Sequence, residues 1–390
     1  MAISKITTES LLDGEITDAK IAGVAATKLT GTIDGARLPA TLPAISGASL
    51  TNLPVQSDIT KSSSNPTVST NPAGGVGTVF LNTTSGEMFV LTDATSGSNV
   101  WTNIGEGAGN IPSYMTATGG TITTDGNYKV HTFLSSGTFT PTIGTAGVGD
   151  FVNYLVVAGG AGGGGGSAGG GGGGAGGMRT SSSFTVSNTG LTVTVGAGGL
   201  GTTSPDNNHG TNGSNSVFSS ITSAGGGYGA GSGVDGTANN GGAGGSGGGA
   251  RYISGTGGAG NTPSTTPSQG NNGGNSLGTT GRPGGGGGGH SAVGVDGGTV
   301  SATGGNGGAG TASSISGSSV TYAGGGAGGG WNSGYGGTGG TGGGGNGGGV
   351  AGGTQTAGTV NKGGGGGGNG QSANGAAGGS GVVIIRYQFQ

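Results

Sequence analysis

The sequence predicts a chain that is mainly β with extensive non-regular structure, and three observations lead to this prediction. Of its 112 glycines, 92 lie between residues 159 and 381, in a chain of 390 residues. Runs of β-branched and aromatic residues lie at both ends of that glycine region. A short repeat opens the chain and is too small to bury its own apolar residues. Together these features predict small β modules and a β-framed sandwich of packed glycine-rich polyproline-II helices, in chains that assemble into a homotrimer or another closed cyclic oligomer.

Residues 1–56 are predicted to be a repetitive N-terminal attachment and stalk segment. LDGEITDAKI (12–21) aligns without gaps with LTGTIDGARL (29–38). Because so short a unit cannot form its own core, it must pack against copies of itself. Fewer than three clear copies are present in one chain, so packing between the chains of a homotrimer or another closed cyclic assembly is expected. The alternative is a flexible anchor whose internal similarity arises by chance.

Residues 57–120 are expected to form a linker followed by a small β-hairpin module. The stretch 57–77 is rich in Ser, Thr, Asn and Pro, which is typical of a linker. Apolar residues then recur on both sides of TTSGE (83–87), whose composition favours a turn. A further apolar group at 100–104 supplies another strand, since a lone hairpin is marginal in water.

Residues 121–390 are predicted to be the β-framed glycine-rich domain. Strand-like sequence occurs at 121–141, 151–160 and 183–199, and the chain ends in GVVIIRYQFQ (381–390). Strands therefore lie on both sides of the glycine.

Three kinds of structure could use so much glycine. A flexible linker would leave the terminal VVIIRY run exposed at the end of a random coil, which favours aggregation. Collagen needs glycine at every third position, and GGGGGG (169–174) keeps no such phase. Polyproline-II helices packed side by side require glycine, because only glycine lets their backbones meet. This third structure is expected, with turns and surface loops between the runs.

The candidate binding residues are large side chains in those turns. Aromatic rings on the loops of a rigid scaffold suit stacking on sugars or anchoring on a protein, and arginine can form forked hydrogen bonds with carboxylate or phosphate. The predicted receptor-binding residues are Tyr228, Tyr252, Trp331, Tyr335, Arg251 and Arg282. The alternative for each ring is that it covers the end of a glycine helix.

Composition and motif spacing argue against several classes of function. With no cysteine, 11 basic and 14 acidic residues, the chain has no thiolate metal site and no basic surface for nucleic acid. The three histidines stand apart, and nothing marks a catalytic pair among the three aspartates of the glycine region. No cofactor, metal ion or enzymatic activity is expected. No stretch has the pattern of a signal peptide or a membrane span, so no membrane insertion is expected.

The order of the segments resembles bacteriophage tail-fibre proteins. The quoted segments are ITDAKIAG (16–23), TGTIDGARLP (30–39), NTTSGEMFVLTDATSGSNVWTNIG (82–105), KVHTFLSSGTFTP (129–141) and GGSGVVIIRY (378–387). The C-terminal region is similar to glycine-rich fibre-tip adhesins. This resemblance implies a trimeric fibre fixed through its N-terminal part to a tail or baseplate protein of the virion, and made in the host cytoplasm without a signal peptide. It also implies a non-catalytic receptor-binding protein whose glycine-rich loops bind a host surface polysaccharide or an outer-membrane protein.

Two other functions stay open at the level of sequence. One is an extracellular silk-like or matrix structural protein, in which glycine runs assemble between molecules. The other is a fibre on the capsid surface built from the same modules. Soluble particles that decorate particular cells would favour attachment, whereas concentration-dependent fibrils without cell selectivity would favour the structural protein.

Overall fold

The computed structural model describes residues 59–106, 114–144, 150–203, 209–231, 239–277, 282–298, 302–370 and 373–389. The predicted stalk, residues 1–56, lies outside this part of the chain. Contacts divide the chain into two compact units, Met1–Gly105 and Glu106–Gln390. Within the described residues all regular structure is β and no helix is present, so the mainly β prediction is confirmed.

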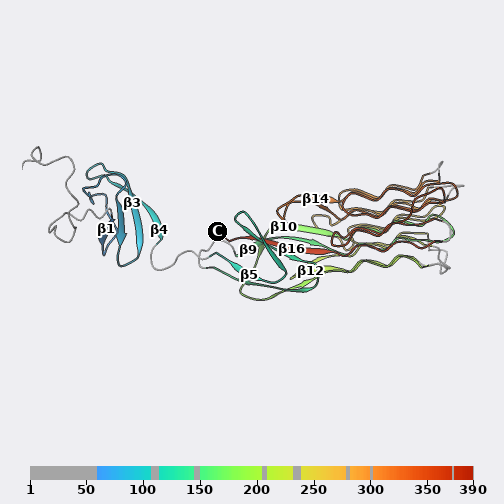
Figure 1. Ribbon diagram of the computed structural model, residues 1–390, viewed down its shortest axis with the longest axis horizontal. Coiled ribbons are helices and arrows are strands. Elements are labelled where there is room, and N and C mark those ends of the chain that lie inside the picture. Colours follow the sequence, from blue (N-terminus) through green and yellow to red (C-terminus); the bar gives the residue numbers. More distant parts are fainter. Residues whose placement is uncertain are drawn as a thin grey trace, which may run out of the picture. The chain divides into compact units, whose positions relative to one another are not determined.

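The first unit contains one four-stranded sheet in the order β1-β2-β3-β4 (Figure 1). Its strands are β1 (Ile59–Ser62), β2 (Val79–Asn82), β3 (Glu87–Asp93) and β4 (Val100–Glu106). The buried apolar residues of its described part are Phe80, Phe89 and Leu91, and the ring of Trp101 packs edge-on against Phe80. The predicted hairpin is present as β2 and β3. The stretch expected to be a linker is not one at its start, because β1 pairs in parallel with β2 and extends the sheet.

The second unit begins with a frame of two five-stranded sheets. The first has the order β10-β9-β16-β7-β6 and the second β13-β12-β11-β8-β5. Their strands are β5 (Thr116–Thr118), β6 (Thr121–Asp125), β7 (Tyr128–Phe133), β8 (Gly137–Thr142), β9 (Phe151–Val157), β10 (Met178–Thr185), β11 (Leu191–Thr194), β12 (Ser216–Phe218), β13 (Ile221–Ser223) and β16 (Val382–Gln388). β5 lies before the boundary expected at 120 and pairs with β8 of this unit.

The two sheets share one core, and the first sheet has a second core on its other face. The shared core joins Val152, Tyr154 and Ile385 of the first sheet to Phe139 and Phe218 of the second. β9 and β16 are apolar on both faces because each face is covered, which explains their continuous apolar sequences.

A β-hairpin covers the second core. It consists of β14 (Thr311–Ser313) and β15 (Val320–Tyr322), and the buried ring of Tyr322 packs with Leu155 and Ile384. Turns and surface loops were expected between the glycine runs, and this expectation is wrong for VTYA (320–323), which contains β15. β15 has only three residues and its partner β14 lies beyond a turn, so this short stretch of sequence did not predict a strand.

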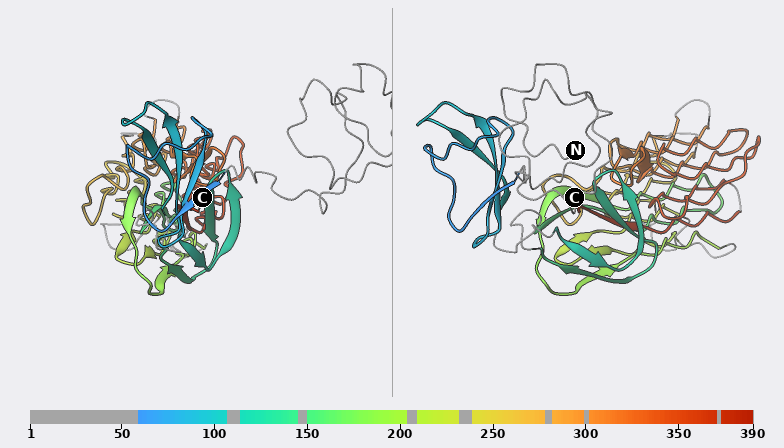
Figure 2. Two further views of the ribbon diagram at one scale, coloured as in Figure 1. Left: turned by 90° about the vertical axis from the view of Figure 1, so that its left-hand side faces the viewer. Right: turned by 60° about the vertical axis from the view of Figure 1, so that its left-hand side comes forward.

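The glycine runs extend away from the frame, side by side in stacked layers (Figure 2). The central run, residues 168–177, donates its N–H groups in strict rotation to three runs: 282–288, 363–369 and 224–230. Its carbonyls accept hydrogen bonds from three others: 158–164, 246–249 and 326–329. The central run therefore has six neighbours: three runs accept its hydrogen bonds and three runs donate hydrogen bonds to it. Successive residues of the central run bond to different neighbouring runs, and residues three positions apart bond to the same run. The central run therefore has a repeat of three residues.

This packing requires glycine because the backbones touch. A Cβ atom on Gly171 would lie well inside 3.0 Å of the carbonyl oxygen of Gly249, and one on Gly172 would meet that of Gly326 in the same way. Neither position has an unusual backbone angle. Glycine is therefore needed here for space and not for a left-handed conformation.

The runs reverse direction at two ends of this lattice. At the near end they join the strands of the frame, as the run 158–165 joins β9 and the run 373–381 joins β16 (Figure 1). At the other end they are connected by turns, of which the structure describes 166–167, 251–254, 331–334 and 350–353. We call these the far-end turns.

Candidate functional site

The far-end turns bring together four of the six residues predicted from sequence. Arg251 and Tyr252 lie on one turn, Trp331 opens another, and Arg282 lies at the start of the run 282–289. The carbonyl of Arg282 accepts a hydrogen bond from the N–H of Gly169 at 2.9 Å, so this cluster lies at the start of the central run.

The guanidinium of Arg282 lies against two aromatic rings. Its central carbon is 4.4 Å from the ring centre of Tyr252 and 5.4 Å from that of Trp331. Stacking uses the face of the guanidinium and leaves the N–H groups at its edge, which are the groups that bind carboxylate or phosphate. It also covers part of the aromatic surface that was expected to stack on a ligand.

Arg251 is a buried cation behind Tyr252. Only 6 % of its surface is exposed, its Nη2 donates a long hydrogen bond of 3.4 Å to the hydroxyl of Ser167, and its central carbon is 5.7 Å from the Tyr252 ring. Burial lowers the pKa of Arg251, Tyr252 opposes that shift, and Arg282 adds to it. Arg251 thus supports the Tyr252 ring from behind and presents little surface for direct contact with a ligand.

The other two predicted residues lie outside this cluster. Tyr335 follows the turn that begins at Trp331 and is 61 % exposed, with Val350 on the adjoining turn also half exposed. Tyr228 lies within the run 224–231, where its ring stacks on His209 at a centroid distance of 4.5 Å. Tyr335 is available to a partner, whereas Tyr228 covers the side of the lattice.

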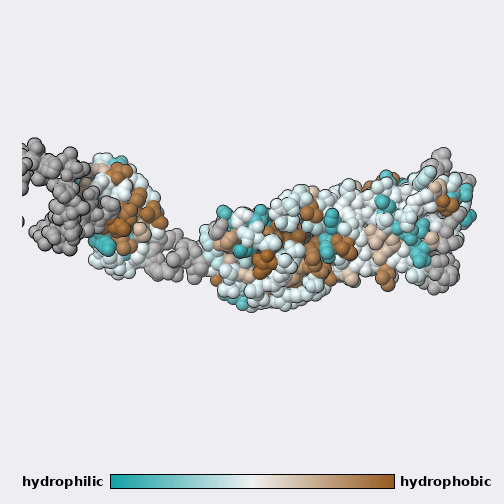
Figure 3. Space-filling model, viewed as in Figure 1, coloured by the Kyte–Doolittle hydropathy of each residue, from teal (hydrophilic) through white to brown (hydrophobic). Residues whose placement is uncertain are grey.

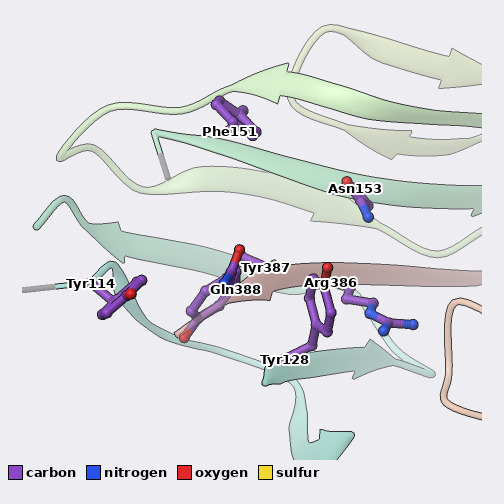
Figure 4. A pocket seen from close by; sticks show the side chains of 7 residues that line it. All are labelled: Tyr114, Tyr128, Phe151, Asn153, Arg386, Tyr387 and Gln388. Carbon is purple, nitrogen blue, oxygen red and sulfur yellow. The ribbon is translucent and has the colours of Figure 1, made fainter. Parts of the chain in front are cut away.

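A hollow that the sequence analysis missed lies in the β frame, at the other end of the second unit. It has a volume of about 200 Å³ and is lined by Tyr114, Tyr128, Phe151, Asn153, Arg386, Tyr387 and Gln388. Figure 4 shows Phe151 and Asn153 on one side of this space and Tyr114, Tyr128 and Gln388 on the other. Figure 3 shows hydrophobic residues gathered over the frame, while most of the glycine lattice has intermediate hydropathy. The one sequence feature that could have pointed to this hollow is Arg386, a charged residue in the mostly apolar strand β16.

The comparison with protein families decides the class of the second unit. A glycine-rich domain family matches residues 132–388, which is more than half of the chain. The chain belongs to the glycine-rich domain family. The match begins within β7 and ends with β16, so it includes the later frame strands, from β8 onward, as well as the glycine lattice, while β5 and β6 lie before it. No curated protein matches the sequence.

The histidines of the glycine-rich domain serve packing. His131 is fully buried, its Nδ1 hydrogen-bonds to the carbonyl of Gly119 at 2.7 Å, and its ring lies edge-on to Phe139. Burial lowers the pKa of His131, and that of His290 is lowered for the same reason. In the part of the chain that the structure describes, no group of three or more His, Asp or Glu side chains could hold a metal ion. The same part contains no helix with the length and apolarity of a bilayer span.

Proposed function

We propose that this chain is a non-catalytic attachment protein of a bacteriophage tail fibre, which binds a host-cell surface receptor through its far-end turns. The observation that supports this function best is the convergence of Tyr252, Arg282 and Trp331 at one end of a rigid lattice, with exposed Tyr335 beside them. Loops on a rigid scaffold are where proteins commonly place their binding residues. The resemblance in segment order supplies the link to phages.

The runs of the lattice are proposed to be polyproline-II helices. A polyproline-II helix has three residues per turn, which fits the return of each hydrogen-bond partner at every third residue. Its backbone makes no internal hydrogen bonds, so every N–H group is free to bond to a neighbouring run. Such a lattice holds the turns at fixed positions, because moving one turn would break hydrogen bonds to several runs.

The fibre is proposed to be a homotrimer fixed to the virion through residues 1–56, on a tail or baseplate protein. The far-end turns would contact a surface polysaccharide or an outer-membrane protein. Three chains in one fibre, and several fibres on one particle, would turn weak single contacts into firm attachment.

Cell binding by the labelled full-length protein tests this function. On a panel of bacterial strains, we expect binding to a few strains, and about a tenfold loss for the double variant Trp331→Ala, Tyr335→Ala, because aromatic anchors dominate binding energy. Leu134→Ala is the matched control, since Leu134 is 54 % exposed but lies in the frame. Equal binding by the double variant and the control would remove the far-end turns as the site. Concentration-dependent fibrils with no strain selectivity would favour the structural-protein alternative.

A further inference from the structure

We propose that the hollow in the β frame binds a neutral sugar ring of a glycan. This goes beyond the proposed function, because β9 and β16, which line the hollow, lie in the frame at the opposite end of the second unit from the far-end turns (Figure 1). Three features of the hollow favour such a ligand: its aromatic surfaces, its charge balance and the rigidity of its walls.

Aromatic side chains supply the apolar surface of this site. Phe151 is 48 % exposed and Tyr114 is 37 % exposed, although large aromatic rings such as these can be buried in a core. Tyr128 adds a third ring to the same lining. Exposed rings that meet around one hollow mark a binding surface more often than scattered exposed residues do. The flat face of such a ring matches the C–H face of a pyranose, and a tyrosine hydroxyl can bond to the sugar's rim.

The charge balance indicates a neutral ligand. Arg386 is the one charged residue in the lining, and its Nη2 is 3.2 Å from the carboxylate of Asp125. Its Nη1 donates to the carbonyl of Ser314 at 3.4 Å, and its central carbon lies 4.0 Å from the Tyr128 ring. With its charge already paired, Arg386 gives little added attraction to an acidic sugar.

Uncharged polar groups remain for sugar hydroxyls. Within the described residues, the side-chain amide of Asn153 and the hydroxyls of Tyr114 and Tyr128 make no hydrogen bond. The Nε atom of Arg386 is buried and also has no hydrogen-bond partner among the described residues. An amide both donates and accepts, as a sugar hydroxyl does, so Asn153 can bond to two neighbouring hydroxyls.

The walls of the hollow are rigid before any ligand arrives. Asn153 on β9 lies opposite Arg386 on β16, and Gln388 on β16 lies opposite Tyr128 on β7, all within one sheet. The contacts of Arg386 hold the Tyr128 ring in place. A site on paired strands loses little conformational entropy when it binds, and this favours measurable affinity in a small hollow.

The experiment is a titration of the full-length protein with methyl glycosides of glucose, galactose, mannose, rhamnose and N-acetylglucosamine, with glucuronate as the acidic probe. We expect saturable binding of at least one neutral glycoside, with a Kd that changes little with salt. Phe151→Ala and Asn153→Ala should each weaken that binding about tenfold, since each removes a central contact. Ile122→Ala is the control, because Ile122 lies opposite His131 and so on the other face of the same sheet.

Four results would overturn the proposal: no binding by any neutral glycoside, binding of glucuronate alone, equal affinity for Phe151→Ala and Ile122→Ala, or a native mass that falls with Phe151→Ala while no glycoside binds. The last result would show that a second copy of the chain covers the hollow. Tyr128→Phe gives a variant that keeps the ring contact with Arg386 and removes only the hydroxyl, and it should weaken binding less than Phe151→Ala does. Cell binding through the far-end turns can persist when this proposal fails, so the two outcomes are distinguishable.

Discussion

Single glycines of the central run lie where any side chain would strike a neighbouring backbone. We expect Gly171→Ala to lower the free energy of unfolding of the second unit by about 3 kcal/mol, because its Cβ atom would collide with the carbonyl of Gly249, which cannot move without shifting a whole run. Thermal or denaturant unfolding followed by circular dichroism measures this. Gly137→Ala is the control, since its Cβ atom would meet only Phe133 at 3.6 Å, and it should leave stability unchanged or raise it by about 0.5 kcal/mol. Equal effects of the two variants would contradict close backbone packing.

His131 makes the stability of the second unit depend on pH. Burial lowers its pKa below the ordinary value of 6.5, so the unfolded chain binds a proton at a higher pH than the folded one does. The free energy of unfolding should therefore be constant above pH 6.5 and fall below it, by up to about 1.4 kcal/mol per pH unit for this one histidine. His131→Gln should flatten the part of the slope that His131 contributes, and His290, whose pKa is also lowered, should keep the remainder. An unchanged slope in the variant would show that His131 does not titrate on unfolding.

At the scale of elements, the last strand closes both cores of the frame. β16 lies between β9 and β7, with Ile385 in the shared core and Ile384 in the core under the β14–β15 hairpin. Ending the chain before residue 381 should abolish cooperative unfolding of the second unit, because β9 and β7 lose their common partner. Hydrogen exchange should then be fast in the second unit and still protected in β2 and β3 of the first. Removing only Gln390 serves as the control and should change nothing. Protected glycine amides in the shortened chain would show that the lattice folds without its closing strand.

At the scale of the whole molecule, we propose that assembly depends on residues 1–56. We expect the full-length protein to have the native mass of a trimer and a 57–390 truncation to have a lower mass, because the predicted stalk repeat packs between chains. Size-exclusion chromatography with light scattering measures both. A truncation that remains trimeric would place the assembly contacts in the units described above. A monomeric full-length protein would show that the repeat does not join chains and is a flexible anchor segment.

The sequence by itself determined the mainly β class and the strands on both sides of the glycine. It also marked six large side chains as candidates, and the structure brings four of them together at the far-end turns. The strands depend on a local property, since β-branched runs favour strands. Only the tertiary structure decided the rest. The glycine runs have no side chains to fix their register, so the position of the central run among its six neighbours depends on the frame strands that hold the ends of the runs. Likewise β1, the β14–β15 hairpin and the hollow around Arg386 depend on partners far away in the chain, which no short stretch of sequence names.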